Sequence, residues 1–136
     1  MRTILASDVT QAVRAACIEA CCVLPDPVVQ ALMRAKEQEQ GHARAVLEQL
    51  LQNARLAREA MRPCCQDTGM AVAFVELGQE VHIQGNLEAA IQAGIAAGYT
   101  EGYLRKSVVS ALSRENTGDN TPGVIHLRLV EGDGFT

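Results

Sequence analysis

The sequence predicts an α+β fold in which amino-terminal helices precede a small sheet with one intervening helix. Three observations support this prediction. Apolar residues before position 62 repeat at helical spacing, two short runs after position 69 are rich in β-branched residues, and prolines or glycines separate the segments. Because so few strands are expected, we predict that residues 1–136 form an incomplete portion of a larger domain.

The first predicted helix starts at Ser7 or Asp8, either of which can cap it, and stops at Pro25. Cys17 and Cys21 lie four residues apart on its apolar face. That spacing could seat a metal ion, but small buried cysteines are commoner in helices. We therefore interpret both cysteines as core residues.

Two further helices are expected before the strands. Asp26 is the predicted cap of the second helix, with Pro27 at its first position, and this helix runs to Gly41. The third helix keeps apolar residues at helical spacing over residues 46–61 and ends at Pro63.

Residues 70–77, MAVAFVEL, are predicted to form a largely buried strand, and residues 81–83 a second short strand. Asn86 then caps a helix that runs through Ile95. Glycines recur on that helix at four-residue spacing, which predicts close packing against another backbone. These glycines are Gly94, Gly98 and Gly102.

Residues 114–122, RENTGDNTP, concentrate side chains that bond nearby backbone and favour turns, so an ordered polar loop is expected there. Residues 123–130 alternate apolar and polar side chains and predict a last strand.

Composition narrows the classes of function. The net charge is −4 and no basic cluster occurs, which argues against a nucleic-acid surface. No apolar run approaches the roughly 20 residues that span a bilayer, and the first residues lack the apolar stretch of a secretory signal. Five cysteines, an odd number, do not resemble an extracellular disulfide framework. We expect a soluble, cytoplasmic protein with neither nucleic-acid nor membrane partners.

The segment RPCCQDTG, residues 62–69, gathers two thiols, an amide, a carboxylate and a hydroxyl at one turn. Neighbouring cysteines cannot easily bind one metal ion together, and no second pair follows at zinc-site spacing. A redox disulfide between them is strained, and the usual CxxC motif is absent. A single exposed thiolate that binds a shared iron–sulfur cluster also stays open as an interpretation.

Three blocks of the sequence occur in a fixed order: PCCQDTGMAVAFVELGQ, EGYLRKSVV and RENTGDNTPGVIHLRLV. Together they resemble the amino-terminal part of the iron–sulfur, class I fumarate hydratases and the alpha subunit of the related L-tartrate dehydratase. The resemblance extends over essentially the whole chain from the first helix onward, and it implies that residues 1–136 are the amino-terminal portion of an alpha-subunit domain.

This resemblance implies a hydro-lyase that interconverts fumarate and L-malate with a four-iron four-sulfur cluster, whose open iron binds substrate oxygen. It implies a small dicarboxylate substrate, the remainder of an alpha subunit, a beta subunit or beta region, and an oligomer. Two alternatives stay open. The substrate is tartrate instead of fumarate, or the chain is a non-catalytic module that binds a partner.

Carried over by position, the resemblance makes Cys65 a cluster ligand and places Gln66 and Asp67 at substrate-contacting positions. Arg105 matches an arginine that meets a substrate carboxylate, although an arginine after a helix is more often a solvated side chain. Cys64 stands where the family commonly has an aliphatic residue. Four residues of the polar loop are expected to support the site: Asn116, Thr117, Asp119 and Asn120.

The family's cluster has three cysteine ligands, and the resemblance matches only one of them to a residue of this chain. It matches no residue of this chain to the family's catalytic base. We therefore expect the chain by itself to be inactive.

Overall fold

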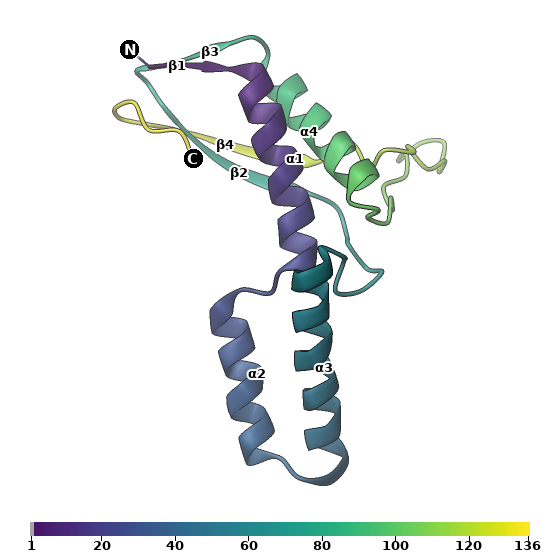
Figure 1. Cartoon of the computed structure of the whole chain (residues 1–136). Helices are drawn as coiled ribbons and strands as arrows, with labels where there is room; N and C mark the ends of the chain where they lie inside the picture. Colours follow the sequence, from purple (N-terminus) through teal and green to yellow (C-terminus); the bar gives the residue numbers. More distant parts are fainter. Residues whose placement is uncertain (1) are drawn as a thin grey trace.

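The computed structural model describes residues 2–136 and confirms an α+β fold (Figure 1). Helices occupy most of the first hundred residues, and two pairs of strands complete the structure. The elements in chain order are β1 (Arg2–Leu5), α1 (Ala6–Cys22), α2 (Asp26–Gln38), α3 (Gly41–Ala60), β2 (Val72–Gly78), β3 (Val81–Gln84), α4 (Leu87–Glu101) and β4 (Val124–Val130).

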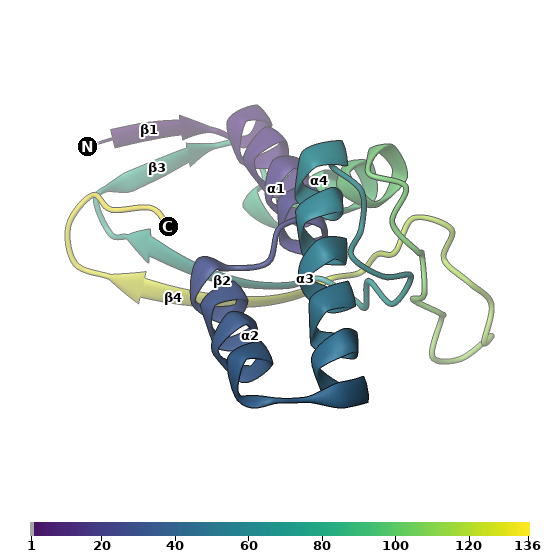
Figure 2. The ribbon, with the colours of Figure 1, turned by 60° about the horizontal axis from the view of Figure 1, so that its bottom comes forward.

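The strands form two separate parallel pairs. Strand β1 pairs with β3, and β2 pairs with β4 in a register that sets Val75 opposite Leu127. Figure 2 shows the two pairs lying beside α1 and α4. The last residues return along the second edge of β2, where the Glu76 and Thr136 backbones exchange hydrogen bonds of 2.9 and 3.1 Å.

Helix positions agree with the sequence prediction, but two cap assignments were wrong. Leu5 occupies the cap position of α1, so neither Ser7 nor Asp8 caps it, because the chain enters the helix directly from β1. Pro25 occupies the cap position of α2, and Asp26 lies in the first turn, since the Val28 N–H already bonds the Pro25 carbonyl. Asp26 still favours the helix there through its charge. The Asn86 cap of α4 is confirmed by its bond to the Ala89 N–H.

Helices α1 and α4 pack directly against each other, as the glycine spacing predicted. A Cβ atom at Gly94 would lie 2.7 Å from the Thr10 carbonyl oxygen, and one at Gly98 would lie 2.8 Å from the Cys17 Cβ. The glycines therefore allow the two backbones to approach more closely than side chains would permit. Thr10 Oγ1 adds a 3.1 Å hydrogen bond to the Ala90 carbonyl across the same interface.

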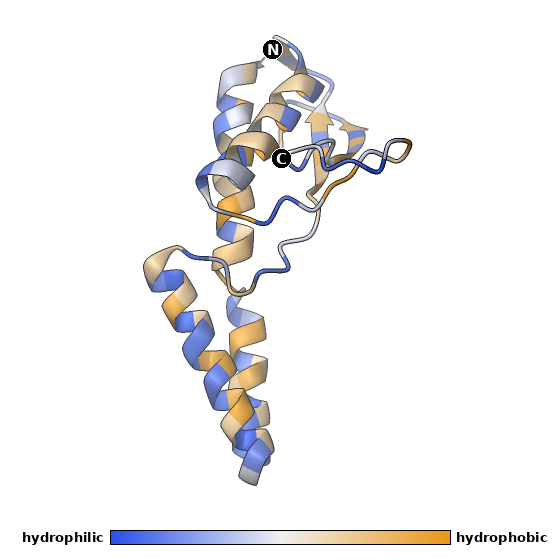
Figure 3. Cartoon of the chain, turned by 90° about the vertical axis from the view of Figure 1, so that its right-hand side faces the viewer, coloured by the Kyte–Doolittle hydropathy of each residue, from blue (hydrophilic) through white to orange (hydrophobic). Residues whose placement is uncertain are grey.

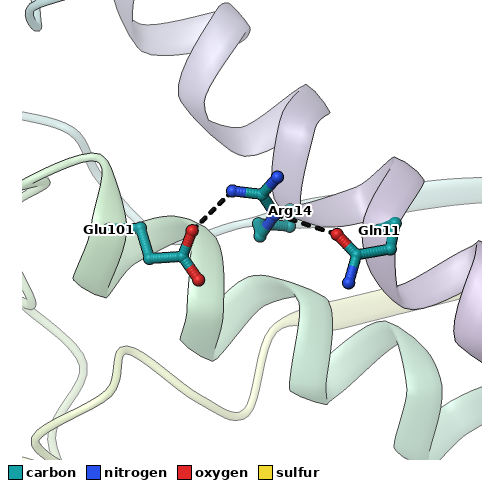
Figure 4. A network of polar contacts seen from close by, with 3 residues as sticks. All are labelled: Gln11, Arg14 and Glu101. Atoms are coloured by element: carbon teal, nitrogen blue, oxygen red, sulfur yellow. Dashed lines mark hydrogen bonds and ion pairs between the residues drawn. The ribbon is translucent and has the colours of Figure 1, made fainter.

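An ion pair lies at the end of this interface. Arg14 of α1 bonds Glu101 of α4 and also reaches Gln11 on its own helix at 3.2 Å (Figure 4). Because the Glu101 side chain is 54% exposed, water screens the pair and it contributes little to stability.

The main core lies between α4, one face of α1 and one face of the β2–β4 pair. Ile91 and Ile95 are each 1% exposed at its centre, and Val75 closes it from the sheet. Cys17 and Cys21 pack against this core, which confirms their interpretation as core residues.

The strand expected at residues 70–77 is confirmed as β2, but the expectation that it is largely buried was wrong. Phe74 is 76% exposed and stacks on the neighbouring His126 ring at a centroid distance of 4.9 Å. Helices cover one face of this sheet and, within residues 2–136, nothing covers the other. An apolar strand composition cannot tell whether a neighbour covers both faces.

Helices α2 and α3 form a hairpin that extends away from the core (Figure 1). No residue of α2 is buried, and Figure 3 shows apolar residues along both helices. Several of these side chains are about half exposed: Val28, Met33, Val46, Leu50 and Leu56. In the described structure the hairpin leaves an apolar surface uncovered.

One helical stretch, Ala6–Gln38, is long and apolar enough by composition to cross a membrane. This is weak support for a membrane span, because core helices of soluble proteins share these properties. The stretch comprises two helices separated by residues 23–25, and α1 packs along α4. The absence of a membrane partner stays a prediction.

Substituting Gly94 by alanine tests the close approach of the two helices. Alanine favours a helix by up to about 1 kcal/mol over glycine, but its methyl group would meet the Thr10 carbonyl. Because overpacking costs about 1–3 kcal/mol, we expect a net loss of unfolding free energy in urea titrations. Gly134→Ala is the control, since a Cβ there meets nothing within 4 Å. An unchanged or higher stability of Gly94→Ala would contradict this packing.

Candidate functional site

Three loops that are far apart in the sequence meet beside the carboxyl end of α4. The first, residues 61–71, carries CCQDTG. The second, residues 102–108, carries Arg105, and the third is the polar loop at residues 114–123. A set of hydrogen bonds between side chains and backbone joins all three.

Tyr99, on the last turn of α4, binds the first loop. Its side chain is 3% exposed, and its hydroxyl lies 2.9 Å from the Thr68 carbonyl oxygen and 3.2 Å from that of Gly69. Burial, followed by the nearby thiols of Cys21 and Cys17, raises the pKa of the Tyr99 hydroxyl to about 12. The hydroxyl therefore keeps its proton at neutral pH and remains a hydrogen-bond donor.

Asn120 binds the first loop to the second. Among the loop residues of 2–136, it is the one polar residue that is fully buried. Its Oδ1 accepts bonds from the N–H groups of Ser107 (2.6 Å) and Val108 (3.0 Å), and its Nδ2 donates to the Gly69 carbonyl at 3.1 Å. The backbone φ of 65° is left-handed, a conformation that asparagine adopts more readily than most residues.

Direct contacts reinforce this bridge. Thr68 Oγ1 donates to the Arg105 carbonyl at 3.0 Å, which joins the CCQDTG loop to the arginine segment. Asn116 Nδ2 donates to the Lys106 carbonyl at 2.8 Å, and the Thr117 N–H donates to the Val108 carbonyl at 3.0 Å. The polar loop therefore follows the arginine segment closely.

Asp119 acts within its own loop. Its Oδ1 accepts bonds from both the hydroxyl and the N–H of Thr121, at 2.7 and 2.9 Å. These bonds hold the pKa of the Asp119 carboxyl below its ordinary value, so the group is charged at neutral pH. The polar loop was predicted to be ordered, and these bonds explain its order.

The two adjacent cysteines lie in different surroundings. The Cys64 N–H donates to the Cys21 carbonyl at 2.9 Å, and its Sγ lies 3.7 Å from the Cys22 carbonyl oxygen. Cys64 thus satisfies carbonyl groups at the end of α1, which lack partners within the helix. Cys65 is exposed, with its Sγ 3.6 Å from the Asp67 carbonyl oxygen.

Three thiols beside the loop, one of them fully buried and two half-buried, are protonated. Burial, followed by neighbouring thiols, raises the pKa of Cys21, Cys22 and Cys64, so these groups stay protonated at neutral pH. Within residues 2–136, no three His, Cys, Asp or Glu side chains are grouped closely enough to hold a metal ion. A complete metal site is therefore not formed by the described residues alone.

The structure brings together only part of what the sequence predicted. The loop of Cys65 is joined to the Arg105 segment through the Thr68 hydroxyl. Gln66 and Asp67 are exposed and lie between Cys65 and Thr68 in the sequence. No hydrogen bond within residues 2–136 joins the Cys65, Gln66 or Asp67 side chain directly to Arg105.

Sequence reasoning missed Tyr99 and Thr68, which hold the loops together. Their bonds go to backbone carbonyls, and such bonds leave no motif in the sequence. The available signal was spacing, because Tyr99 follows Ile91 and Ile95 at four-residue steps and so falls on the buried face of α4. A buried tyrosine hydroxyl usually needs a polar partner.

An apolar cavity of about 410 Å³ lies beside this junction, between α1 and the start of β2. Its walls include Cys17, Cys21, Met70, Ile95 and the Tyr99 ring, and no charged side chain lines it. A dicarboxylate would lose its hydration there without a charged partner, so this cavity does not suit such a substrate.

Comparison with known proteins identifies the family. Residues 10–136 match the family model described as fumarate hydratase (Fumerase). The chain is 38% identical over 90 residues to the aerobic class I fumarate hydratase of Salmonella typhimurium, a match that covers 64% of this chain. It is 29% identical over 99 residues to the alpha subunit of L(+)-tartrate dehydratase from Escherichia coli K12, which covers 72% of this chain.

The chain belongs to the fumarate hydratase family. It spans 16% of the length of the Salmonella fumarate hydratase and 33% of the length of the tartrate dehydratase alpha subunit. These relatives therefore contain much sequence that has no counterpart in residues 1–136.

Replacing Asn120 by alanine tests the bridge between the loops. The change removes the acceptor of two part-buried N–H groups and puts alanine in a left-handed conformation. Because an unsatisfied buried group costs about 1–3 kcal/mol and these two groups are part-buried, we expect a loss of about 1–3 kcal/mol in unfolding free energy. Asn116→Ala, at an exposed position, should cost less than about 1 kcal/mol. Equal losses in the two variants would contradict the role of Asn120.

Proposed function

We propose that this chain is the amino-terminal portion of an iron–sulfur-dependent hydro-lyase that interconverts fumarate and L-malate. Family membership supports a hydro-lyase role, since the relatives are a fumarate hydratase and a tartrate dehydratase subunit. The observation that carries the proposal is the junction of the CCQDTG loop with the Arg105 segment through the Thr68 hydroxyl. It joins the sequence block that carries the Cys65 thiol to the block that carries the Arg105 guanidinium group.

The residues fit one corner of a four-iron four-sulfur cluster. Cys65 is exposed on a loop, whereas the neighbouring Cys64 is turned toward α1. An accessible thiol that can ionise is what such a cluster requires from each of its protein ligands. The remaining ligands would have to come from outside residues 2–136, because no group of three ligating side chains occurs within them.

The bound cluster would supply an open iron that acts as a Lewis acid toward a substrate oxygen. The roles of this chain's residues are to hold and orient. Cys65 holds the cluster, and Gln66 and Asp67 are placed next to it in the sequence to contact the substrate. In the described part of the chain, no ion pair engages the Arg105 guanidinium.

Arg105 is suited to bind one carboxylate of the substrate. A guanidinium group presents a planar pair of donors that matches a carboxylate, and the charge assists both hydrogen bonds. The backbone of Arg105 is fixed by the Thr68 hydroxyl, and the neighbouring Lys106 carbonyl is fixed by Asn116. Such anchoring limits the positions that the guanidinium can reach.

Fumarate is the first substrate to test, because identity to the fumarate hydratase is 38% against 29% to the tartrate dehydratase subunit. Tartrate is the second candidate, since the match to that subunit covers the larger share of this chain. We propose that the remainder of an alpha subunit and a beta subunit or beta region complete the enzyme. A cytoplasmic location is part of the proposal, and the unpaired cysteines support it.

The two adjacent cysteines give the sharpest test of the cluster. In the assembled enzyme, Cys65→Ser should lose iron, because a hydroxyl that rarely ionises replaces a soft thiolate. Cys64→Ser should keep its iron and activity, since a serine hydroxyl can still donate to the Cys22 carbonyl. Iron and sulfide analysis after anaerobic reconstitution measures both. Equal loss from the two variants, or a normal cluster in Cys65→Ser, would defeat the assignment.

Arg105→Lys tests substrate binding in the same assembly. Lysine keeps the charge but loses the paired donors, and one charge-assisted bond contributes about 1.5–3 kcal/mol. We therefore expect kcat/KM to fall by roughly ten- to a hundredfold on the true substrate. Arg114→Lys is the matched control on an exposed loop position. Unchanged kinetics on both fumarate and tartrate would show that Arg105 is a solvated surface residue that does not bind the substrate.

A further inference from the structure

Residues 65–67 form a short bridge that is anchored at both ends. At one end, the Cys64 N–H bonds the Cys21 carbonyl, and Asn53 Nδ2 donates to the Cys64 carbonyl at 2.8 Å. At the other end, the Tyr99 hydroxyl bonds the carbonyls of Thr68 and Gly69. Only three residues lie between these anchors, so the second anchor restricts where Cys65 can lie.

Tyr99 contacts the arginine segment as well, through its main chain. Its carbonyl accepts the Leu104 N–H at 3.1 Å, one residue before Arg105. The side chain of Tyr99 therefore holds one loop while its backbone holds the other. Both contacts start from the rigid, buried last turn of α4.

We propose that Tyr99 is a positioning residue, which sets the Cys65–Asp67 bridge at a fixed place relative to the Arg105 segment. This inference rests on the proposed function for the roles of Cys65 and Arg105. The geometry itself requires no cluster, because both contacts are present in the polypeptide alone. Asn120 supports the same carbonyl of Gly69, but Tyr99 supplies the contact to the Thr68 carbonyl.

The test compares Tyr99→Phe with Tyr103→Phe in the intact polypeptide without metal. Both variants lose one hydroxyl oxygen and keep the ring. Tyr103 lies four residues further along and is 85% exposed, so it is a matched control. In Tyr99→Phe the ring still fills the core and the main-chain bond to Leu104 remains.

Hydrogen exchange should detect the loss locally. We expect the hydrogen-bonded amides beside the bridge, those of Cys64, Ser107 and Val108, to exchange about five- to tenfold faster in Tyr99→Phe, as the loss of one buried hydrogen bond implies. Amides in the centre of α4 should exchange as in the unmodified protein. Tyr103→Phe should match the unmodified protein throughout.

A spectroscopic measurement reports on Cys65 itself. A nitroxide label is attached to this exposed cysteine, with the labelled position verified by peptide mapping. Its electron paramagnetic resonance spectrum should gain a mobile component in Tyr99→Phe and none in Tyr103→Phe. A general loss of packing would speed exchange across α4 as well, which separates a structural effect from positioning.

The proposal is overturned if loop exchange in Tyr99→Phe stays within about twofold of the unmodified protein. It is also overturned if α4 loosens to the same degree, or if Tyr103→Phe gives the same spectrum as Tyr99→Phe. These outcomes are independent of cluster assembly. Failure of Cys65 to bind iron would defeat the proposed function and leave the positioning result unchanged.

Discussion

The buried carboxamide of Asn120 is the constraint on which the candidate site depends. Its oxygen accepts two N–H groups of the arginine segment, and its nitrogen donates to the loop that carries Cys65. An unpaired amide in this fully buried position would be costly, so the three loops order together or not at all. The candidate site is therefore a property of three segments that are separate in the sequence.

Close packing of helices α1 and α4 supplies the platform for this network. Glycines at the interface let α4 approach α1, and this packing fixes the last turn, from which Tyr99 reaches the CCQDTG loop. The end of α1 contributes from the other side, because Cys64 bonds its terminal carbonyls. The helices thus hold both ends of the short segment that bears Cys65, while the open sheet face and the α2–α3 hairpin lie outside this support.

Sequence reasoning predicted the local features and missed those that depend on distant contacts. Periodicity and helix-start signals located the four helices of residues 2–136, and the glycine spacing of α4 correctly indicated its backbone packing. It missed β1, since Arg2–Leu5 carries no pattern of its own and pairs with residues about eighty positions later. It made residues 70–77 a buried strand because composition does not reveal which face is covered. Motif resemblance selected Cys65 and Arg105, but the side chains that join their loops bond to backbone atoms and have no sequence signature.

The central claim is that the Cys65 and Arg105 loops form one coupled unit. A double-mutant cycle of Thr68→Val and Asn120→Ala measures this directly through the unfolding free energies of the two single variants and the double variant. Both substitutions break connections between the same loops, so we expect a coupling energy of about 0.5–3 kcal/mol. Additive losses, within about 0.3–0.5 kcal/mol, would show that the loops are held independently and would contradict the account.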